Sequence, residues 1–187
     1  MEDPQSAILM ALYRNRRDEA RKLAEGAALT IWEAAALGRD ERVAQLLDQD
    51  PALANAWSPD GYPPVGLAAF FAGAATVALL LDRGAEVAAA SRNTMKVQPL
   101  HAAVASRRAD TVALLLERGA DVNARQQAGY TPLMAAADSG RQDLVDLLLA
   151  HSADAALRSD DGKSAADIAR EHGHPELAAR LEPSSAS

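Results

Sequence analysis

The sequence predicts an all-α solenoid of about six stacked helix-turn-helix units, joined by β-hairpin-like loops. A similar segment begins at positions 30, 64, 99, 132 and 165, so the spacings are 34, 35, 33 and 33 residues. Each copy is followed by a second apolar stretch with helical spacing, such as Val112–Leu116. Self-similarity at this period is typical of repeat proteins, whose units share one continuous core because a single unit cannot bury its apolar face.

The first helix of each unit has a recognisable start. In the copy Thr131–Ala137, the Thr131 hydroxyl can accept a hydrogen bond from a free N–H group of the first turn. Pro132 follows at the first helical position, where a missing N–H has no cost. The run of alanines from 135 to 137 allows two helices to approach closely. We therefore expect a short, tightly packed helix here.

The second helix and the turn after it follow from the leucines and the glycine. Leu144, Leu147, Leu148 and Leu149 form an apolar stripe at helical spacing, and burying each leucine contributes roughly 1.5–3 kcal/mol. Gly119 follows the equivalent helix one unit earlier, where a residue in the left-handed conformation is preferred. These features predict a helix pair closed by a glycine turn.

The repeated motifs resemble the ankyrin repeat family. The resemblance is carried by Pro99-Leu100-His101-Ala102-Ala103, Gly129-Tyr130-Thr131-Pro132-Leu133, Leu114-Leu115-Leu116 and Gly119-Ala120-Asp121-Val122-Asn123-Ala124. The period also agrees with the roughly 33 residues of that family. The leucine and alanine content and the loop Asp50–Asn55 look more like its bacterial members. The resemblance implies an ankyrin-repeat α-solenoid.

One domain is expected over residues 6–182. Its units should lie near 6–28, 29–57, 58–92, 93–125, 126–158 and 159–182, with a frayed tail at 1–5 and a disordered tail at 183–187. The first unit is shorter than the others and lacks the Thr-Pro start. Charged residues in the first and last units suit end units, which need polar outer faces.

Composition and charge narrow the possible partners. The chain has 187 residues and a net charge of −7, which disfavours nucleic acids and anionic membranes because both require a basic surface. It has no cysteine, so neither a disulfide framework nor thiolate chemistry is available. No apolar run approaches the roughly 18 residues of a membrane span. We expect a cytoplasmic protein.

The histidines are the first residues to consider for catalysis. The family resemblance implies that His101 serves hydrogen bonding between repeats. His172 and His174 flank a glycine at the expected turn of the last unit, and a metal site there would need a third ligand such as Glu171 or Glu176. The chain also lacks a nucleophile elbow and a complete phosphate-binding loop. We predict no catalytic residue, no metal and no cofactor.

The family resemblance places partner binding on the concave side, formed by hairpin tips and exposed positions of the inner helices. The predicted partner-binding residues there are Trp57, Tyr62, Phe70, Phe71, Arg92, Met95, Arg125 and Tyr130. Five of the seven aromatic residues of the chain are in this set, and aromatic residues and arginine are enriched at interface hot spots. The alternative is that these aromatic side chains pack locally against loops and helices.

Three arginines recur near the hairpin tips. Arg92, Arg125 and Arg158 are spaced 33 residues apart. They can form a basic row suited to a partner with an acidic patch. Alternatively, they form a solvated row paired with Asp60, Asp160 and Asp161.

These observations predict a non-enzymatic protein-protein interaction module. It would be a monomer that acts as a scaffold, an adaptor or an inhibitor of another protein. The alternatives are a self-associating structural protein, for instance a homodimer, and a small metal-dependent enzyme built around His172 and His174.

Overall fold

The computed structural model describes residues 6–182, and the expectations for the tails at 1–5 and 183–187 concern residues outside this range. Within it the chain forms twelve α-helices and no strand, which confirms the all-α repeat fold. The helices are α1 (Ala7–Tyr13), α2 (Arg17–Leu23), α3 (Ile31–Leu37), α4 (Asp40–Gln49), α5 (Pro64–Leu67), α6 (Ala74–Asp82), α7 (Pro99–Ala105), α8 (Ala109–Glu117), α9 (Pro132–Asp138), α10 (Gln142–Ala150), α11 (Ala165–Glu171) and α12 (Pro175–Leu181). A π-helical turn, η2 (Ala68–Ala72), prolongs α5, and two 3₁₀ turns, η1 (Pro51–Asn55) and η3 (Gln127–Gly129), lie in loops.

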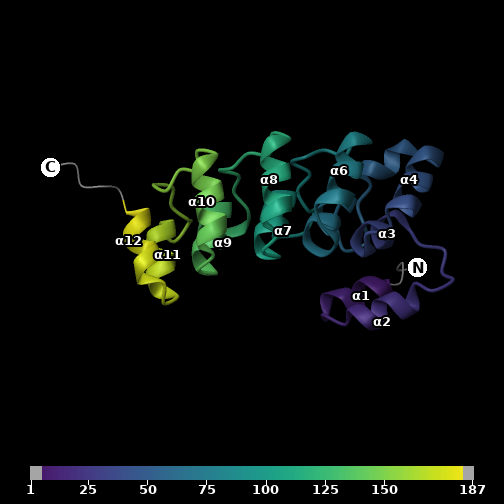
Figure 1. Cartoon of the computed structure of the whole chain (residues 1–187), viewed down its shortest axis with the longest axis horizontal. Coiled ribbons are helices and arrows are strands. Elements are labelled where there is room, and N and C mark those ends of the chain that lie inside the picture. The colour runs from purple at the N-terminus through teal and green to yellow at the C-terminus, as the bar shows by residue number, and fades with distance from the viewer. Residues whose placement is uncertain (1–5, 183–187) are drawn as a thin grey trace.

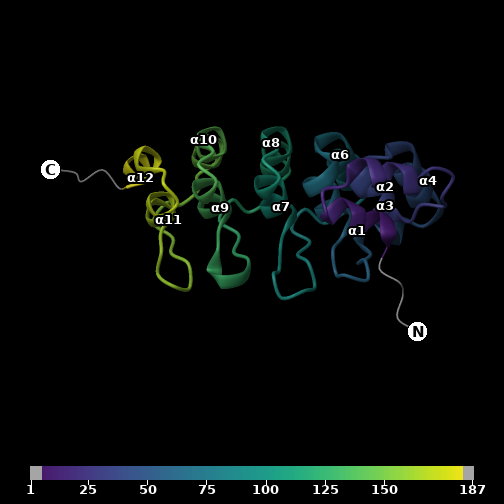
Figure 2. The same ribbon diagram turned by 90° about the horizontal axis from the view of Figure 1, so that it is seen from below.

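Five helix pairs, from α3–α4 to α11–α12, stand side by side in a row (Figure 1). The first helix of each pair is the inner one, and the loops that precede α5, α7, α9 and α11 project together from the inner helices (Figure 2). We call these the hairpin loops, and we call the surface that they form with the inner helices the inner face. Neighbouring hairpin loops are joined by backbone hydrogen bonds, from Arg92 to Gly61 (2.8 Å), from Gln127 to Met95 (3.0 Å) and from Asp160 to Ala128 (2.9 Å).

The predicted motif residues lie where the sequence requires them. The Thr131 hydroxyl accepts a hydrogen bond from the Met134 N–H (3.3 Å) and so caps α9, with Pro132 at the first helical position. Ala136 and Ala137 are fully buried, as are Leu144 and Leu148 of the partner helix α10. The repeat core is therefore built from alanines on the inner helices and leucines on the outer helices.

The outer helices are linked by ion pairs that the repeat motif did not reveal. Arg83 contacts Asp48 (2.6 Å) and Arg118 contacts Asp82 (2.7 Å), in each case reaching from one repeat to the preceding one. All four side chains are more than a third exposed. Because water and salt screen such pairs, each contributes no more than about 1 kcal/mol.

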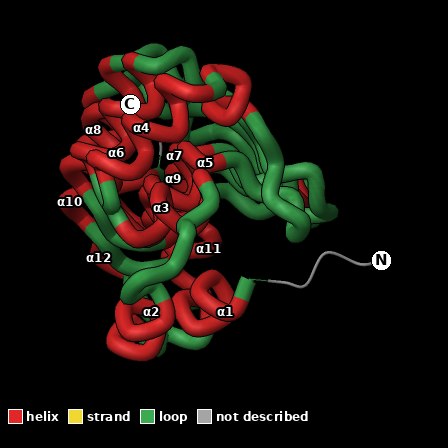
Figure 3. Tube along the Cα trace, turned by 90° about the vertical axis from the view of Figure 1, so that its right-hand side faces the viewer, coloured by secondary structure: helices red, strands yellow, loops and turns green. Residues whose placement is uncertain are grey.

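The first helix pair is arranged differently from the other five. It lies against the inner helices near α3, off the line of the row (Figures 1 and 3). The row already begins with a more polar surface, because Gln45 of α4 is exposed where the following outer helices have the partly buried Leu79, Leu114 and Leu147. α3–α4 therefore has the polar outer face expected of an end repeat, and α1–α2 is an addition to the row.

Arg107 allows a direct test of backbone strain in the central repeat. It adopts φ 61° in the turn between α7 and α8, where the equivalent residues of the next two repeats are Gly140 and Gly173. A left-handed residue with a side chain costs roughly 1–2 kcal/mol, and the extra freedom of glycine in the unfolded chain offsets about 0.5–1 kcal/mol of that. We expect Arg107→Gly to raise the free energy of unfolding by about 0.5–1 kcal/mol, as measured by urea denaturation. A lower stability would contradict this account of the turn.

Candidate functional site

A hollow of about 260 Å³ lies on the inner face, between the hairpin loops and the inner helices. Tyr62 and Met95 line it from the loops, and Phe70 and Ala105 line it from the inner-helix side. Tyr13, the last residue of α1, lines the hollow as well. The walls are predominantly apolar. Apart from Tyr13, the lining residues come from three successive repeats, those of α5, α7 and α9, and the repeat of α3–α4 contributes none.

Exposed apolar side chains gather at this hollow. Among the described residues, four large hydrophobic residues are exposed: Tyr13 (41%), Leu23 (43%), Phe70 (39%) and Met95 (47%). All of them except Leu23 line the hollow. Phe70 and Met95 therefore lie on the exposed part of the inner face.

The π-helical turn sets the positions of the two phenylalanines. In the neighbouring repeats the chain leaves the inner helix at a residue with positive φ, such as Arg107 or Gly140. Ala72 occupies this position here, and the helix continues for one more residue to Gly73, which has φ 125° and ψ −167°. The Gly73 N–H donates to the carbonyl of Ala68 (2.9 Å), as the equivalent Arg108 N–H donates to Ala103 (3.0 Å), so this repeat differs by the helical conformation of Ala72 and not by that hydrogen bond. Such π-helical turns are frequent at functional sites.

Phe71 differs from the sequence prediction. It was expected on the exposed inner face, but it is only 8% exposed. The ring of Tyr13 lies over it at a centroid distance of 5.4 Å, and the ring of Phe70 packs edge-on at 4.8 Å. The physical reason is the placement of α1, which covers this part of the inner face. Phe71 still lines the hollow, but α1 leaves only a small part of its surface exposed.

Trp57 and Arg92 are engaged with each other. The Trp57 indole N–H donates to the carbonyl of Ala90 (3.2 Å), and the Arg92 guanidinium lies 3.6 Å from the centre of the indole ring. This cation–π contact stiffens two adjacent hairpin loops. Neither residue lines the hollow. For these two residues the structure favours the alternative of local packing.

The other predicted arginines also bind within the chain. Arg125 donates to the carbonyl of Arg158 (2.6 Å) and lies 3.7 Å from Asp160. Arg158 donates to the carbonyl of Gly162 (2.6 Å) and contacts Asp167 (3.2 Å). Arg92 and Arg125 therefore link successive loops, Arg158 binds within its own repeat, and the side chains of Arg125 (44%) and Arg158 (61%) stay exposed.

Tyr130 and His101 form a contact between repeats. The buried His101 Nε2 lies 3.3 Å from the carbonyl oxygen of Tyr130, so Nε2 is the protonated nitrogen. Burial lowers the pKa of His101, which keeps its imidazole neutral. Tyr130 is half-buried, and burial followed by the nearby carboxylate of Asp138 raises the pKa of its phenol. This contact confirms the hydrogen bonding between repeats predicted for His101.

The histidines near the C-terminus also have structural partners. His172 pairs with Asp138 of the preceding repeat. The His174 ring lies directly over Gly140, so that a side chain at Gly140 would collide with it. Within residues 6–182, no three His, Cys, Asp or Glu side chains meet in a way that would hold a metal ion. The described residues offer no metal site to support the alternative of a metal-dependent enzyme.

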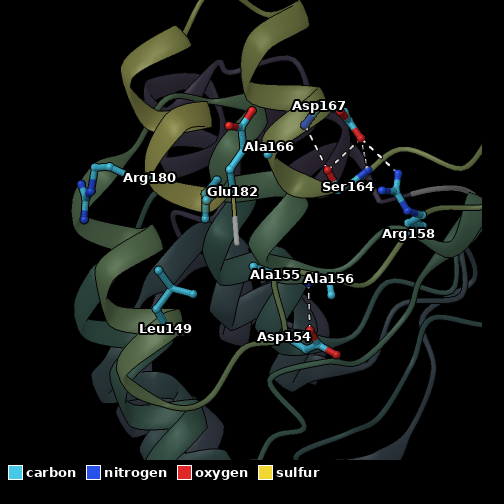
Figure 4. A pocket seen from close by; sticks show the side chains of 11 residues that line it. Leu149, Asp154, Ala155, Ala156, Arg158, Ser164, Ala166, Asp167, Arg180 and Glu182 are labelled. Atoms are coloured by element: carbon cyan, nitrogen blue, oxygen red, sulfur yellow. Dashed lines mark hydrogen bonds and ion pairs between the residues drawn. The ribbon is translucent and has the colours of Figure 1, made fainter. Parts of the chain in front are cut away.

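A second, larger hollow of about 660 Å³ lies beside α11 and α12 (Figure 4). Its charged groups are already partnered, because Asp167 accepts hydrogen bonds from Ser164 and from Arg158. The hydrogen bonds from Ser164, first from its backbone N–H and then from its hydroxyl, lower the pKa of Asp167 to about 2. This network caps the N-terminus of α11, so we assign it a structural role.

The sequence did not identify Tyr13 as a site residue. Its hydroxyl donates to Asp60 of the hairpin loop before α5 (2.6 Å), and its ring packs near Tyr62 at 6.3 Å. Burial, and then the hydrogen bond to Asp60, raise the pKa of the phenol, so it remains a donor. The repeat alignment placed this residue in a stacked first unit, and nothing in the alignment indicated that α1 would cross the inner face.

Comparison with known families agrees with the repeat pattern. A family described as ankyrin repeats (3 copies) matches residues 31–126, and a family described as ankyrin repeats (many copies) matches residues 115–169. No curated protein matches the chain. In the described part of the chain, no helix has both the length and the apolar character needed to cross a membrane.

Proposed function

This chain belongs to the ankyrin repeat family, whose repeats generally serve as protein-protein interaction modules, and we propose that it binds a partner protein through the hollow on its inner face. The binding would be non-enzymatic. Occupation of this face by a partner would serve scaffolding, adaptor or inhibitory roles. Tyr62, Phe70 and Met95 are the residues that we expect to contact the partner.

The observation that carries this proposal is the gathering of exposed apolar side chains at a small hollow. Its volume of about 260 Å³ lies below the roughly 300–1,000 Å³ of small-molecule and cofactor sites. It suits one or two large side chains inserted by a partner, and such anchors supply most of the energy of protein interfaces. The small size of the hollow therefore favours a protein ligand.

The rigidity of the inner face supports the same conclusion. The hairpin loops are tied by backbone hydrogen bonds and by the side chains of Arg92 and Arg125. A face that is already ordered loses less conformational entropy when a partner binds. Arg92 and Arg125 therefore support binding indirectly, because their contacts within the chain hold the hairpin loops in place.

We expect a peptide ligand to depend on Phe70 and Met95. Peptides would be selected from a displayed random library against the folded full-length chain, and their affinities measured by fluorescence anisotropy. Phe70→Asp or Met95→Asp should weaken binding at least about 30-fold, the effect of losing a hot-spot contact of about 2 kcal/mol.

Leu23→Asp is the matched control. Leu23 is an equally exposed large apolar residue (43%), but it lies on α2 and does not line the hollow. Its substitution should leave affinity unchanged. If Phe70→Asp, Met95→Asp and Leu23→Asp all bind the selected peptides as the wild type does, the hollow is not the binding site.

A further inference from the structure

The first helix pair covers part of the proposed binding surface, although the row does not need it as an end cap. The exposed Gln45 of α4, at the position of a leucine in the following outer helices, already gives the row a polar end. α1–α2 instead lies against the inner helices (Figure 3). A segment of this chain is therefore seated on the inner face, and it shows which kind of ligand that face accepts.

The seated segment is a short amphipathic helix. Its buried residues include Ile8, Leu9 and Leu12, which share one side of α1 because Leu12 follows the other two by four and three positions. At its start the Ser6 hydroxyl donates to Glu33 of α3 (2.6 Å), and at its end Tyr13 donates to Asp60. The inner face thus holds an apolar helical stripe between two polar contacts.

α1 leaves the adjoining hollow unfilled. It has seven residues, about 10 Å of helix, and it ends at Tyr13, which is also the residue at which the hollow begins. A longer helix in the same place would make the contacts of α1 and would also cover Phe70 and Met95. A longer helix would therefore bury more apolar surface on the inner face than α1 does.

The connection between α2 and α3 allows α1–α2 to be exchanged. Glu25, Gly26, Ala27 and Ala28 are exposed, and Gly26 has φ 71°. Within this connection the chain is therefore held mainly at Leu29, which is buried beside α3. This connection therefore adds little to the contacts that α1 and α2 themselves make with the core.

We propose that the partner of this protein presents an amphipathic α-helix, longer than α1, which replaces α1 on the inner face and extends into the hollow. This inference rests on the proposed function and specifies its ligand. The recognised helix carries aliphatic residues in the α1 pattern, then further large apolar residues that reach Phe70 and Met95.

The test uses a fluorescein-labelled, hydrocarbon-stapled peptide of about 18 residues, roughly 27 Å of helix, that continues the pattern of Ile8, Leu9, Leu12 and Tyr13 over further turns. Its binding is measured with the full-length variant Ser6→Cys/Glu33→Cys. The natural chain has no cysteine, so a short bismaleimide joins only these two positions and fixes α1. We expect the crosslink to weaken binding at least about tenfold, equivalent to 1.4 kcal/mol. The same variant without crosslinker is the control.

A second pair of variants tests the inference in the opposite direction. Leu9→Asp places a charge beneath α1 and should release it, so that the peptide binds more tightly than to wild type. Ala7→Asp is the control, because Ala7 is exposed on the same helix, and it should have no effect. Circular dichroism verifies that each variant remains folded.

The outcomes separate this inference from the proposed function. Equal binding to the crosslinked and free forms would overturn the replacement of α1, and so would a stapled peptide that binds neither form nor Leu9→Asp. In both cases library-selected peptides that require Phe70 and Met95 would still support the proposed function. If the library-selected peptides bound equally well without Phe70 and Met95, both the proposed function and this inference would be overturned.

Discussion

Leu115→Ala is expected to lower the free energy of unfolding by about 2–5 kcal/mol, the usual cost of removing a fully buried leucine side chain. Leu115 lies in the central outer helix α8 and has no exposed surface. Its removal leaves a cavity between repeats. Because each repeat contacts only its neighbours, weakening the middle of the row should also separate unfolding into two steps.

Leu114→Ala is the matched control for this prediction. Leu114 is the adjacent residue of α8, but it is only partly buried against the core. Chemical denaturation followed by circular dichroism should show a smaller loss for Leu114→Ala and a single transition. Equal losses for the two variants would contradict the assignment of Leu115 to the shared core.

Gly73→Ala should have the second largest effect and should reduce both stability and binding. Gly73 has φ 125° and ψ −167°, a region that is essentially restricted to glycine, and a strained residue of this kind costs about 1–3 kcal/mol. A Cβ atom would also lie 3.0 Å from the guanidinium of Arg108. That guanidinium donates to the carbonyls of Phe70 (3.4 Å) and Phe71 (2.8 Å), so the strain is transmitted to the hollow.

Gly119→Ala is the control, because it introduces backbone strain at a glycine that makes no contact with the hollow. Gly119 also has positive φ (87°), but an added Cβ atom would meet nothing within 4 Å. It should lose roughly 1–2 kcal/mol of stability and keep its affinity for the selected peptides. Thermal unfolding and anisotropy measure the two effects. Unchanged binding by Gly73→Ala would show that the π turn does not position Phe70.

The repeat fold could be predicted from the sequence because its determinants are local. Thr131, Pro132 and the leucines of α10 specify a helix pair within one unit, and recurrence of the same pattern specifies the row. The contact of His101 with the following repeat could be anticipated for the same reason, since it recurs with the motif. Every one of these features depends on residues within about one period of each other.

The site was less predictable because it depends on departures from the pattern. The cover of α1 over Phe71 requires a first helix pair that leaves the row, and the position of Phe70 requires a π turn at Ala72. Likewise, the pairing of Trp57 with Arg92 depends on the shapes of two neighbouring loops. The repeat alignment treats all units as equivalent, so it cannot express such differences.

The nearest-neighbour packing of the row has a consequence for the length of the molecule. A repeat in the middle, such as that of α7 and α8, meets the same kind of surface on each side, while the two ends carry the specialised polar faces. A gene duplication that inserted another copy of residues 93–125 would therefore lengthen the protein by one repeat, and the terminal repeats would not have to change. Growth or shortening by whole modules is the simplest way for such a chain to match ligands of different size.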